Sequence, residues 1–432
     1  MPLRAALRFW LWLGCVSFGG PAGQIAVMHQ ELVERRRWIS ERRFLHALNY
    51  CMVLPGPEAQ QLATYIGWLL HGWRGGIVAG SLFVLPSLLL LIALSWAYMV
   101  FGNTPLVSGL LYGVKPAITA VVLFAAWRIG SRALRNGALV AIAAVAFLSL
   151  FLLHLPFPLV IAAAAAAGWI GGRARPELFA AGGHGSAQKS YGPALIDDST
   201  PPPPHAQFTR RRLFLSLAAG AAIWALAMAS LWLLAGAANP LTHMGQFFTQ
   251  AALLTFGGAY AALPYVYQAA VLHYHWLRAP QMMDGLALGE TTPGPLIMVV
   301  SFVGFVGAWQ QRALPSPAAA GIAGACVATF FTFLPSFVFI LAGAPMVEAT
   351  REEARLSAPL TAITAAVVGV ILNLAAFFAL QVLWPHGIGG GFDPVAALFA
   401  LVGAAVLFRY QTGMIRVILA SAAAGLALRL LT

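Results

Sequence analysis

Breaks rich in glycine and proline interrupt apolar stretches of this sequence at four places. They are Phe18-Gly19-Gly20-Pro21 and Pro55-Gly56-Pro57 in the first half, and Phe256-Gly257-Gly258 and Pro293-Gly294-Pro295 in the second. A helix that starts after such a break leaves its first N–H groups unpaired, and these groups favour an anion together with the positive end of the helix dipole. Four converging ends could therefore hold a small dianion with few charged side chains.

Polar side chains flank the breaks. They are Ser17, Gln24, Glu58, Gln60 and Gln61 in the first half, and Thr255, Tyr260, Glu290, Thr291 and Thr292 in the second. A carboxylate at membrane depth costs ~2.5 to 3.5 kcal/mol, so Glu58 and Glu290 need a reason. Glu290 is interpreted either as a proton-carrying or site-shaping acid or as a hydrogen-bonded carboxylate that completes a broken turn. Glu58 follows its break directly and is interpreted as a helix N-terminal residue.

Lys115 precedes Pro116 at the expected start of a membrane crossing. It is interpreted either as a lysine that snorkels to the interface or as a cation that faces a bound anion. Glycine and proline also kink membrane helices or let them pack closely, so one isolated break would carry no functional meaning. The recurrence of both kinds of break at a fixed register favours the functional interpretation.

That recurrence is a tandem repeat. The breaks of the second half follow those of the first at a constant offset of 238 residues, and Trp276 follows Trp38 at the same offset. Leu85-Pro86-Ser87 is echoed later by Leu334-Pro335-Ser336. We expect a first repeat over residues 1–172, a polar linker over residues 173–212 and a second repeat over residues 213–432.

The composition excludes a soluble protein. Of 432 residues, 60% are hydrophobic and 9% are charged, against roughly 25% charged residues in ordinary globular domains. The net charge of +12 comes from short basic clusters between apolar runs, so we interpret it as a topology signal rather than a nucleic-acid surface. The sequence predicts an all-α polytopic membrane protein. It offers no nucleophile with a base, no metal-ligand cluster and no cofactor motif, so an enzyme is the least favoured class.

The positive-inside rule gives a topology with the amino terminus and the linker in the cytoplasm. An extra apolar segment at about residues 213–235 inverts the second repeat, and a connector with five arginines in the first half has one arginine in the second. We therefore predict an inverted repeat with broken or re-entrant hairpins in each half. The nine expected crossings are residues 77–101, 116–127, 138–153, 157–171, 213–235, 318–341, 360–383, 395–408 and 414–430.

The sequence resembles the long, two-domain form of the chromate ion transporter family. The resemblance covers both halves, with FGGPAGQIAVMHQE, LPGPEAQQLATYIGW and FVLPS in the first and TFGGAYAALPYV, DGLALGETTPGPLIMVVSFVGF and FLPSFVFI in the second. It implies a transporter of the cytoplasmic membrane that expels chromate with energy from the proton motive force. The family motifs fall on residues 18–21, 55–57, 115, 256–258 and 290–295. The chain departs from them at Gln24, where many members have histidine, and at Glu58, where a small polar residue is usual.

The leading expectation is a proton-coupled exporter that binds chromate or a similar oxyanion at midplane half-helix ends. Sulfate or another tetrahedral oxyanion is an alternative cargo, because helix N–H groups distinguish isosteric dianions poorly. A passive anion channel is an alternative of a different class. Protons and membrane lipid are the other expected partners, nucleic acid is not expected, and a homodimer stays open.

Overall fold

The computed structural model is all-helical over the part of the chain that it describes. It describes residues 2–18, 20–179, 191–201, 203–256, 258–349, 357–385, 387 and 391–431. The first half contains α1 (Leu3–Val16), α2 (Gly20–His29), the π-helix η1 (Gln30–Arg35), α3 (Glu41–Val53), α4 (Glu58–Phe101), α5 (Pro105–Ala133), α6 (Gly137–Phe151), α7 (Phe157–Ala174) and the short α8 (Pro176–Phe179).

The 3₁₀ turn η2 (Pro204–Ala206) leads into α9 (Arg210–Leu234). The second half continues with α10 (Pro240–Leu254), α11 (Ala259–Tyr267), the π-helix η3 (Gln268–His273), α12 (Ala279–Thr291), the 3₁₀ turn η4 (Leu296–Met298), α13 (Val299–Gln310), α14 (Pro317–Ala349), α15 (Ser357–Leu383), α16 (Pro394–Tyr410) and α17 (Met414–Leu431).

The elements of the two halves correspond closely. The π-helices η1 and η3 are separated by the same 238 residues as the sequence motifs, and so are α3 and α12. The residues that follow each π-helix repeat as well, because Arg37 and His275 both have positive φ, 50° and 54°. A π-helix is rare, so its recurrence at one register is a specific sign of duplication.

Helix α4 is a tight hairpin rather than one straight rod. His71 and Gly72 have non-helical backbone angles, and Gly72 has a φ of 66°. Gly67 packs directly against Gly75 and Ala79. In a straight helix, Ala79 would lie about 18 Å from Gly67 along the helix axis. Residues 58–70 and 73–101 therefore form two antiparallel helical segments that pack against each other. They correspond to the separate helices α13 and α14, whose Gly304 and Gly324 make the same close contact.

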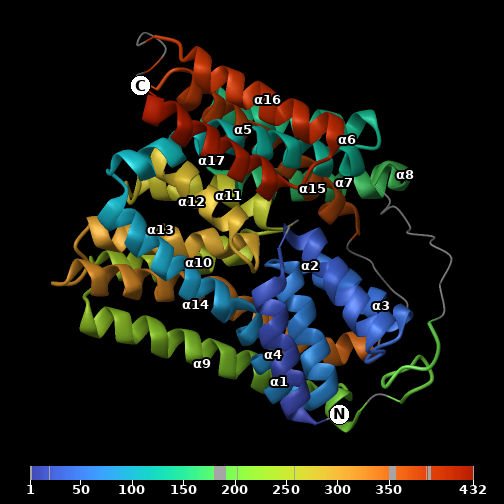
Figure 1. Cartoon of the computed structure of the whole chain (residues 1–432). Coiled ribbons are helices and arrows are strands. Elements are labelled where there is room, and N and C mark those ends of the chain that lie inside the picture. The colour runs from blue at the N-terminus through green and yellow to red at the C-terminus, as the bar shows by residue number, and fades with distance from the viewer. Residues whose placement is uncertain are drawn as a thin grey trace.

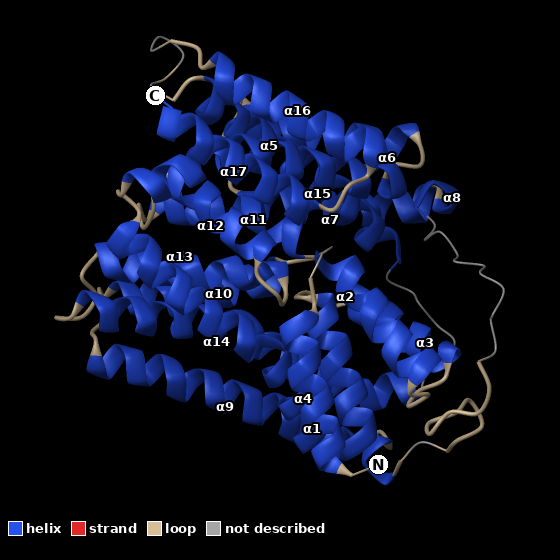
Figure 2. Ribbon diagram, viewed as in Figure 1, coloured by secondary structure: helices blue, strands red, loops and turns tan. Residues whose placement is uncertain are grey.

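Packing divides the molecule into two groups of helices (Figure 1). In one, α5 packs against α15, α16 and α17, and α15 also packs against α6 and α7. In the other, α4 packs against α1 and α14, and α14 also packs against α10, α13 and α9. Helix α9 lies along the outer face of the second group, opposite α16, with Gly220 as its buried residue against Val338. Figure 2 shows that loops join the helices around the centre of the molecule.

The structure confirms a polytopic membrane protein. Within the described residues, seven helices are long and apolar enough to cross a membrane: α4, α5, α7, α9, α14, α15 and α17. Two expected crossings are shorter, because α6 has 15 residues and α16 has 17, whereas a crossing needs about 20. The expected start of a crossing at Pro116 was wrong, since α5 begins at Pro105 and carries Pro116 inside it. Proline is tolerated within a membrane helix when neighbouring helices satisfy the freed carbonyl.

The described part of the predicted linker lies against the first half. Ile196 pairs with Ile39 in an isolated β-bridge, and the Leu195 N–H donates to the Arg37 carbonyl at 2.8 Å. The His205 ring bonds the Trp68 carbonyl at 2.9 Å, next to the turn of the α4 hairpin. These contacts hold the described linker residues on α4 and on the segment between η1 and α3.

Candidate functional site

The four breaks depend on backbone angles that glycine adopts most readily. Gly20 has a φ of 70°, Gly56 of 123°, Gly258 of 90° and Gly294 of 109°. A residue with a β-carbon is strained in this region, and glycine is not. Each break ends one helix and begins another, so α2, α4, α11 and the η4–α13 segment all start at a break. Gly19 and Gly257, which were predicted site residues, lie outside the described residues.

Each proline-glycine-proline loop contacts the break of the opposite half. The Gly294 N–H donates a 2.8 Å hydrogen bond to the Ser17 carbonyl. The Gly56 N–H donates a 2.7 Å hydrogen bond to the Thr255 carbonyl. Ser17 and Thr255 occupy equivalent positions in the repeat, as do Gly56 and Gly294, so the two contacts are reciprocal. The structure thus brings the four breaks together in two pairs, each with one break from either half.

The same loops also meet a serine of the opposite half. A β-carbon on Gly294 would lie 2.6 Å from Cβ and 2.9 Å from Oγ of Ser87, and a β-carbon on Gly56 would overlap the Ser336 hydroxyl. Ser87 and Ser336 are the serines of the two Leu-Pro-Ser motifs, and both side chains are buried. The motif was read from the sequence as a mark of the repeat, and its serines were not recognised as site residues.

Buried polar atoms without hydrogen-bond partners gather around the breaks of the first half. Gln24 is fully buried, and its Nε2 donates to the carbonyls of Ser17 and Gly294, while its Oε1 has no partner. Gln61 is placed similarly, with Nε2 donating to the Pro55 carbonyl at 2.7 Å. The other atoms of this kind are Ser17 Oγ, Gln60 Oε1, Gln61 Oε1 and Ser87 Oγ. Since buried polar groups are normally paired, such a cluster points to a place where water or a ligand binds.

Two carboxylates lie beside the start of α11. Glu58 begins α4, as predicted, and its Oε1 lies 3.6 Å from the point where a β-carbon on Gly258 would lie. Glu290, which is 7% exposed, accepts a hydrogen bond from the Tyr260 hydroxyl. Both acids therefore belong to the region of the breaks, and Glu290 has a specific partner.

Several predicted site residues use their polar groups locally. The hydroxyls of Thr255, Thr291 and Thr292 donate to backbone carbonyls of their own helices, so their protons already have acceptors. Phe18 is 41% exposed, whereas Phe256 is half-buried. Pro21, Pro55 and Pro293 are half-buried, and Pro57 and Pro295 are buried.

Lys115 faces α12, the helix that ends just before the Pro293-Gly294-Pro295 break. It is in the middle of α5, and its Nζ is 3.8 Å from Oδ1 of Asp284 on α12. Asp284 is 2% exposed, and its Oδ2 accepts a 2.9 Å hydrogen bond from the Tyr98 hydroxyl. The sequence analysis did not select Asp284 or Tyr98. The signal was available, because Asp284 is a carboxylate inside an apolar stretch, which was the argument applied to Glu290.

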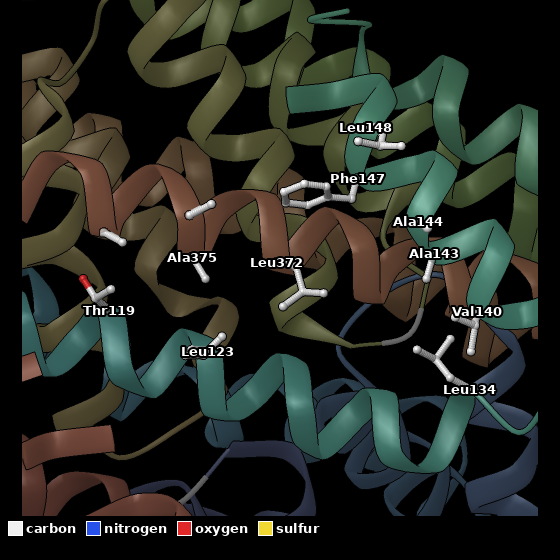
Figure 3. A pocket seen from close by; sticks show the side chains of 12 residues that line it. Thr119, Leu123, Leu134, Val140, Ala143, Ala144, Phe147, Leu148, Leu372 and Ala375 are labelled. Atoms are coloured by element: carbon white, nitrogen blue, oxygen red, sulfur yellow. The ribbon is translucent and has the colours of Figure 1, made fainter. Parts of the chain in front are cut away.

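An open cleft of about 610 Å³ lies elsewhere, between α5, α6 and α15 (Figure 3). Its lining is aliphatic or aromatic except for Thr119, whose hydroxyl donates to the Lys115 carbonyl at 3.3 Å. A lining of this kind suits hydrocarbon and offers a dianion no set of donors. The breaks are therefore the better candidate for an anion site.

Comparison with known proteins identifies relatives over both halves. The family model described as "Chromate transporter" matches residues 4–169 and 242–426, which leaves out the whole linker and α9. The chain is 30% identical over 410 residues to a chromate transport protein of Cupriavidus metallidurans, covering 95% of this chain and 88% of the relative. It is 35% identical over 370 residues to a chromate transport protein of Pseudomonas aeruginosa, covering 84% and 77%.

A probable chromate transport protein of Synechococcus elongatus is 29% identical over 382 residues, covering 88% of this chain and 86% of the relative. No solved structure matches. The family match spans both repeats and the elements that carry all four breaks. The chain belongs to the chromate transporter family.

Proposed function

We propose that this protein exports chromate across the cytoplasmic membrane, driven by the proton motive force, and binds the oxyanion where the four breaks meet. The observation that carries the proposal is the pair of reciprocal hydrogen bonds, Gly294 to Ser17 and Gly56 to Thr255, surrounded by unpartnered polar atoms. Interrupted helices that meet at the interface of two repeats are the usual setting for substrate in secondary transporters. Family membership and the names of the relatives support an oxyanion cargo.

We further propose that the two repeats are inverted with respect to the membrane, with the amino terminus and the linker in the cytoplasm. Reciprocal contacts between equivalent residues are what an approximate two-fold axis produces. The arginines that follow η1 in the first half are replaced after η3 by Tyr274 and His275. The positive-inside rule then supports an axis that lies in the membrane plane, which places η1 and η3 on opposite sides.

The packing of the breaks differs between the halves, and this difference supports alternating access. Helix α11 packs against α15, and α12 packs against α5 and α17. Their first-half counterparts α2 and α3 pack against η1 and α4, and α11 and α12 make the equivalent contacts with η3, η4 and α13. The packing of α11 and α12 on α15, α5 and α17 has no comparable equivalent for α2 and α3 within the described residues (Figure 1). An exchange of these two arrangements between the repeats would move the opening of the site from one side of the membrane to the other.

Glu290 is the proposed proton-coupling residue. It is buried on α12, and its bond to Tyr260 joins it to the helix α11 that starts at the second-half break. A carboxylate at membrane depth is costly and commonly belongs to a proton relay or an ion pathway. Movement of α11 relative to α12 would change this bond, which gives protonation of Glu290 a route to the site.

The test is flux of oxyanion into or out of proteoliposomes that contain the purified protein. Chromate and sulfate are compared, each with and without an imposed proton gradient. We expect chromate flux that exceeds sulfate flux and that requires the gradient. Flux without dependence on the gradient would support an anion channel or exchanger instead. Equal fluxes of the two anions would support a broader tetrahedral-oxyanion transporter, because backbone N–H groups recognise charge and size.

A further inference from the structure

Asp284 is a buried carboxylate that the proposed mechanism does not use. It lies on α12, is 2% exposed and accepts a hydrogen bond from Tyr98 through Oδ2. Its Oδ1 makes no hydrogen bond and lies 3.8 Å from Lys115 Nζ. A buried carboxylate without compensation is costly, so Lys115 is the group that balances its charge.

The distance between the Lys115 ammonium and the Asp284 carboxylate is longer than that of a direct hydrogen bond. Charge-assisted hydrogen bonds between an ammonium and a carboxylate are normally about 2.7 to 2.9 Å long, well below the 3.8 Å found here. The Lys115 side chain is 31% exposed, whereas Asp284 is almost completely enclosed. Lysine carries a compact charge on a flexible stem, so its ammonium can move while the aspartate stays in place.

The pair also joins the two halves of the molecule. Lys115 and Tyr98 belong to the first half, on α5 and α4, and Asp284 belongs to the second. The position equivalent to Asp284 in the first half is His46, whose ring bonds the Val347 carbonyl at 3.3 Å. The repeat therefore does not duplicate this arrangement, because the position equivalent to Asp284 holds a histidine and no carboxylate.

We propose that Asp284 is the resting counter-ion of Lys115, and that a tetrahedral oxyanion competes with Asp284 for this ammonium during transport. The proposal rests on the proposed function and adds the group that the anion must displace. A dianion outcompetes a single carboxylate for one cation when it approaches as closely, because the attraction scales with charge. Asp284 then opposes anion binding, returns Lys115 after release, and acts as a positioning residue.

The opposite charges of the pair give opposite effects on anion affinity. In Asp284→Asn, Lys115 keeps its charge and loses its competitor, so the KM for chromate falls by about tenfold or more. In Lys115→Met, the KM rises by about the same factor, and the thermal midpoint falls because a buried carboxylate has lost its cation. In the double variant Lys115→Met/Asp284→Asn, the midpoint recovers and the KM stays high.

The experiment measures chromate flux in proteoliposomes and thermal unfolding in detergent for the full-length chain and these three variants. Tyr98→Phe is the matched control, since it removes the other partner of Asp284 without changing any charge, and we expect a lower midpoint with an unchanged KM. An unchanged KM in Asp284→Asn would overturn the proposal. So would a double variant that recovers both the midpoint and the wild-type KM, because the pair would then be structural.

Failure of this inference and failure of the proposed function give different results. If the wild-type protein carries chromate and Asp284→Asn has the wild-type KM, the inference fails and the proposed function stands. If the wild-type protein carries neither chromate nor sulfate, the proposed function fails and the counter-ion role fails with it. The thermal midpoints need no anion, so they still report whether the two side chains are coupled.

Discussion

Gly294 packs directly on Ser87, so closely that a β-carbon on the glycine would lie 2.6 Å from Cβ of the serine. The two residues come from different halves of the chain, and Gly56 meets Ser336 in the same way. Each loop is therefore held in a space that admits no side chain. Because the loops also determine where the half-helices start, these contacts fix the geometry of the candidate anion site.

The first prediction concerns Gly294→Leu. The new side chain would clash with Ser87, and the φ of 109° would strain any residue with a β-carbon. We expect insertion into the membrane to persist and chromate transport to fall by more than tenfold. Transport in proteoliposomes and the amount of protein in membranes are the measurements.

Gly236→Leu is the matched control for that variant. Gly236 has a similar φ of 97°, and nothing lies within 4 Å of its β-carbon position. It shares the backbone strain of about 1 to 3 kcal/mol without the clash. We expect it to keep most of the transport activity. Normal transport by a well-expressed Gly294→Leu protein would remove the argument for a site at these loops.

The second prediction separates Glu290 from other buried acids. Glu290→Gln removes a titratable proton and keeps an oxygen that can accept from Tyr260. If Glu290 carries the coupling proton, gradient-driven export is lost while chromate binding remains close to that of the wild type. We expect the pH profile of flux to flatten, measured from pH 5 to pH 8 in about six steps.

Glu348→Gln is the control, because Glu348 is also buried and also accepts from a tyrosine, at 2.6 Å from the Tyr65 hydroxyl. It lies on α14 with Arg43 close by, and not at the start of α11. We expect its pH profile to stay like that of the wild type. A wild-type profile in Glu290→Gln would assign that residue to structure.

The third prediction concerns two of the buried glutamines, Gln24 and Gln60. Gln24→Leu removes the donor that bonds the carbonyls of Ser17 and Gly294 across the halves. The loss leaves buried acceptors short of a partner, at a cost of about 1 to 3 kcal/mol. We expect a lower thermal midpoint and weaker transport. Gln60→Leu is the comparison, since Nε2 of Gln60 donates within its own helix to Thr64, and its midpoint should fall less.

The duplication and the breaks were readable from the sequence because each depends on local residues. Glycine with positive φ is required at Gly56 and Gly294 whatever surrounds them, and the offset of 238 residues carries through to the π-helices. The contacts of these loops with Ser87 and Ser336 depend on how the two halves pack. No local pattern encodes that packing, so the serines were seen as a motif and not as part of the site.

Lys115 shows a different limit of the sequence. Residues 116–127 were predicted as a crossing, with Lys115 just before its start. In the structure α5 starts at Pro105, so Lys115 is well inside the helix and meets Asp284. Which acid faces a given lysine is decided by the crossing of α5 and α12, and these helices are far apart in the sequence.

The last prediction concerns the region where the linker contacts the first half. Arg43 on α3 is 7% exposed, lies 3.8 Å from Glu348 and donates to the Thr200 carbonyl. Arg43→Met removes the cation beside a buried carboxylate, and a change of this kind typically lowers the free energy of unfolding by about 3 to 5 kcal/mol. Arg43→Met/Glu348→Gln should recover part of that loss, because it removes the carboxylate left without its cation.

Arg35→Met is the control, since Arg35 pairs with Glu31 from a side chain that is 64% exposed, and screening by solvent makes the loss of this pair small. Thermal unfolding in detergent distinguishes the variants. Equal midpoints for Arg43→Met and Arg35→Met would contradict a buried ion pair at this position.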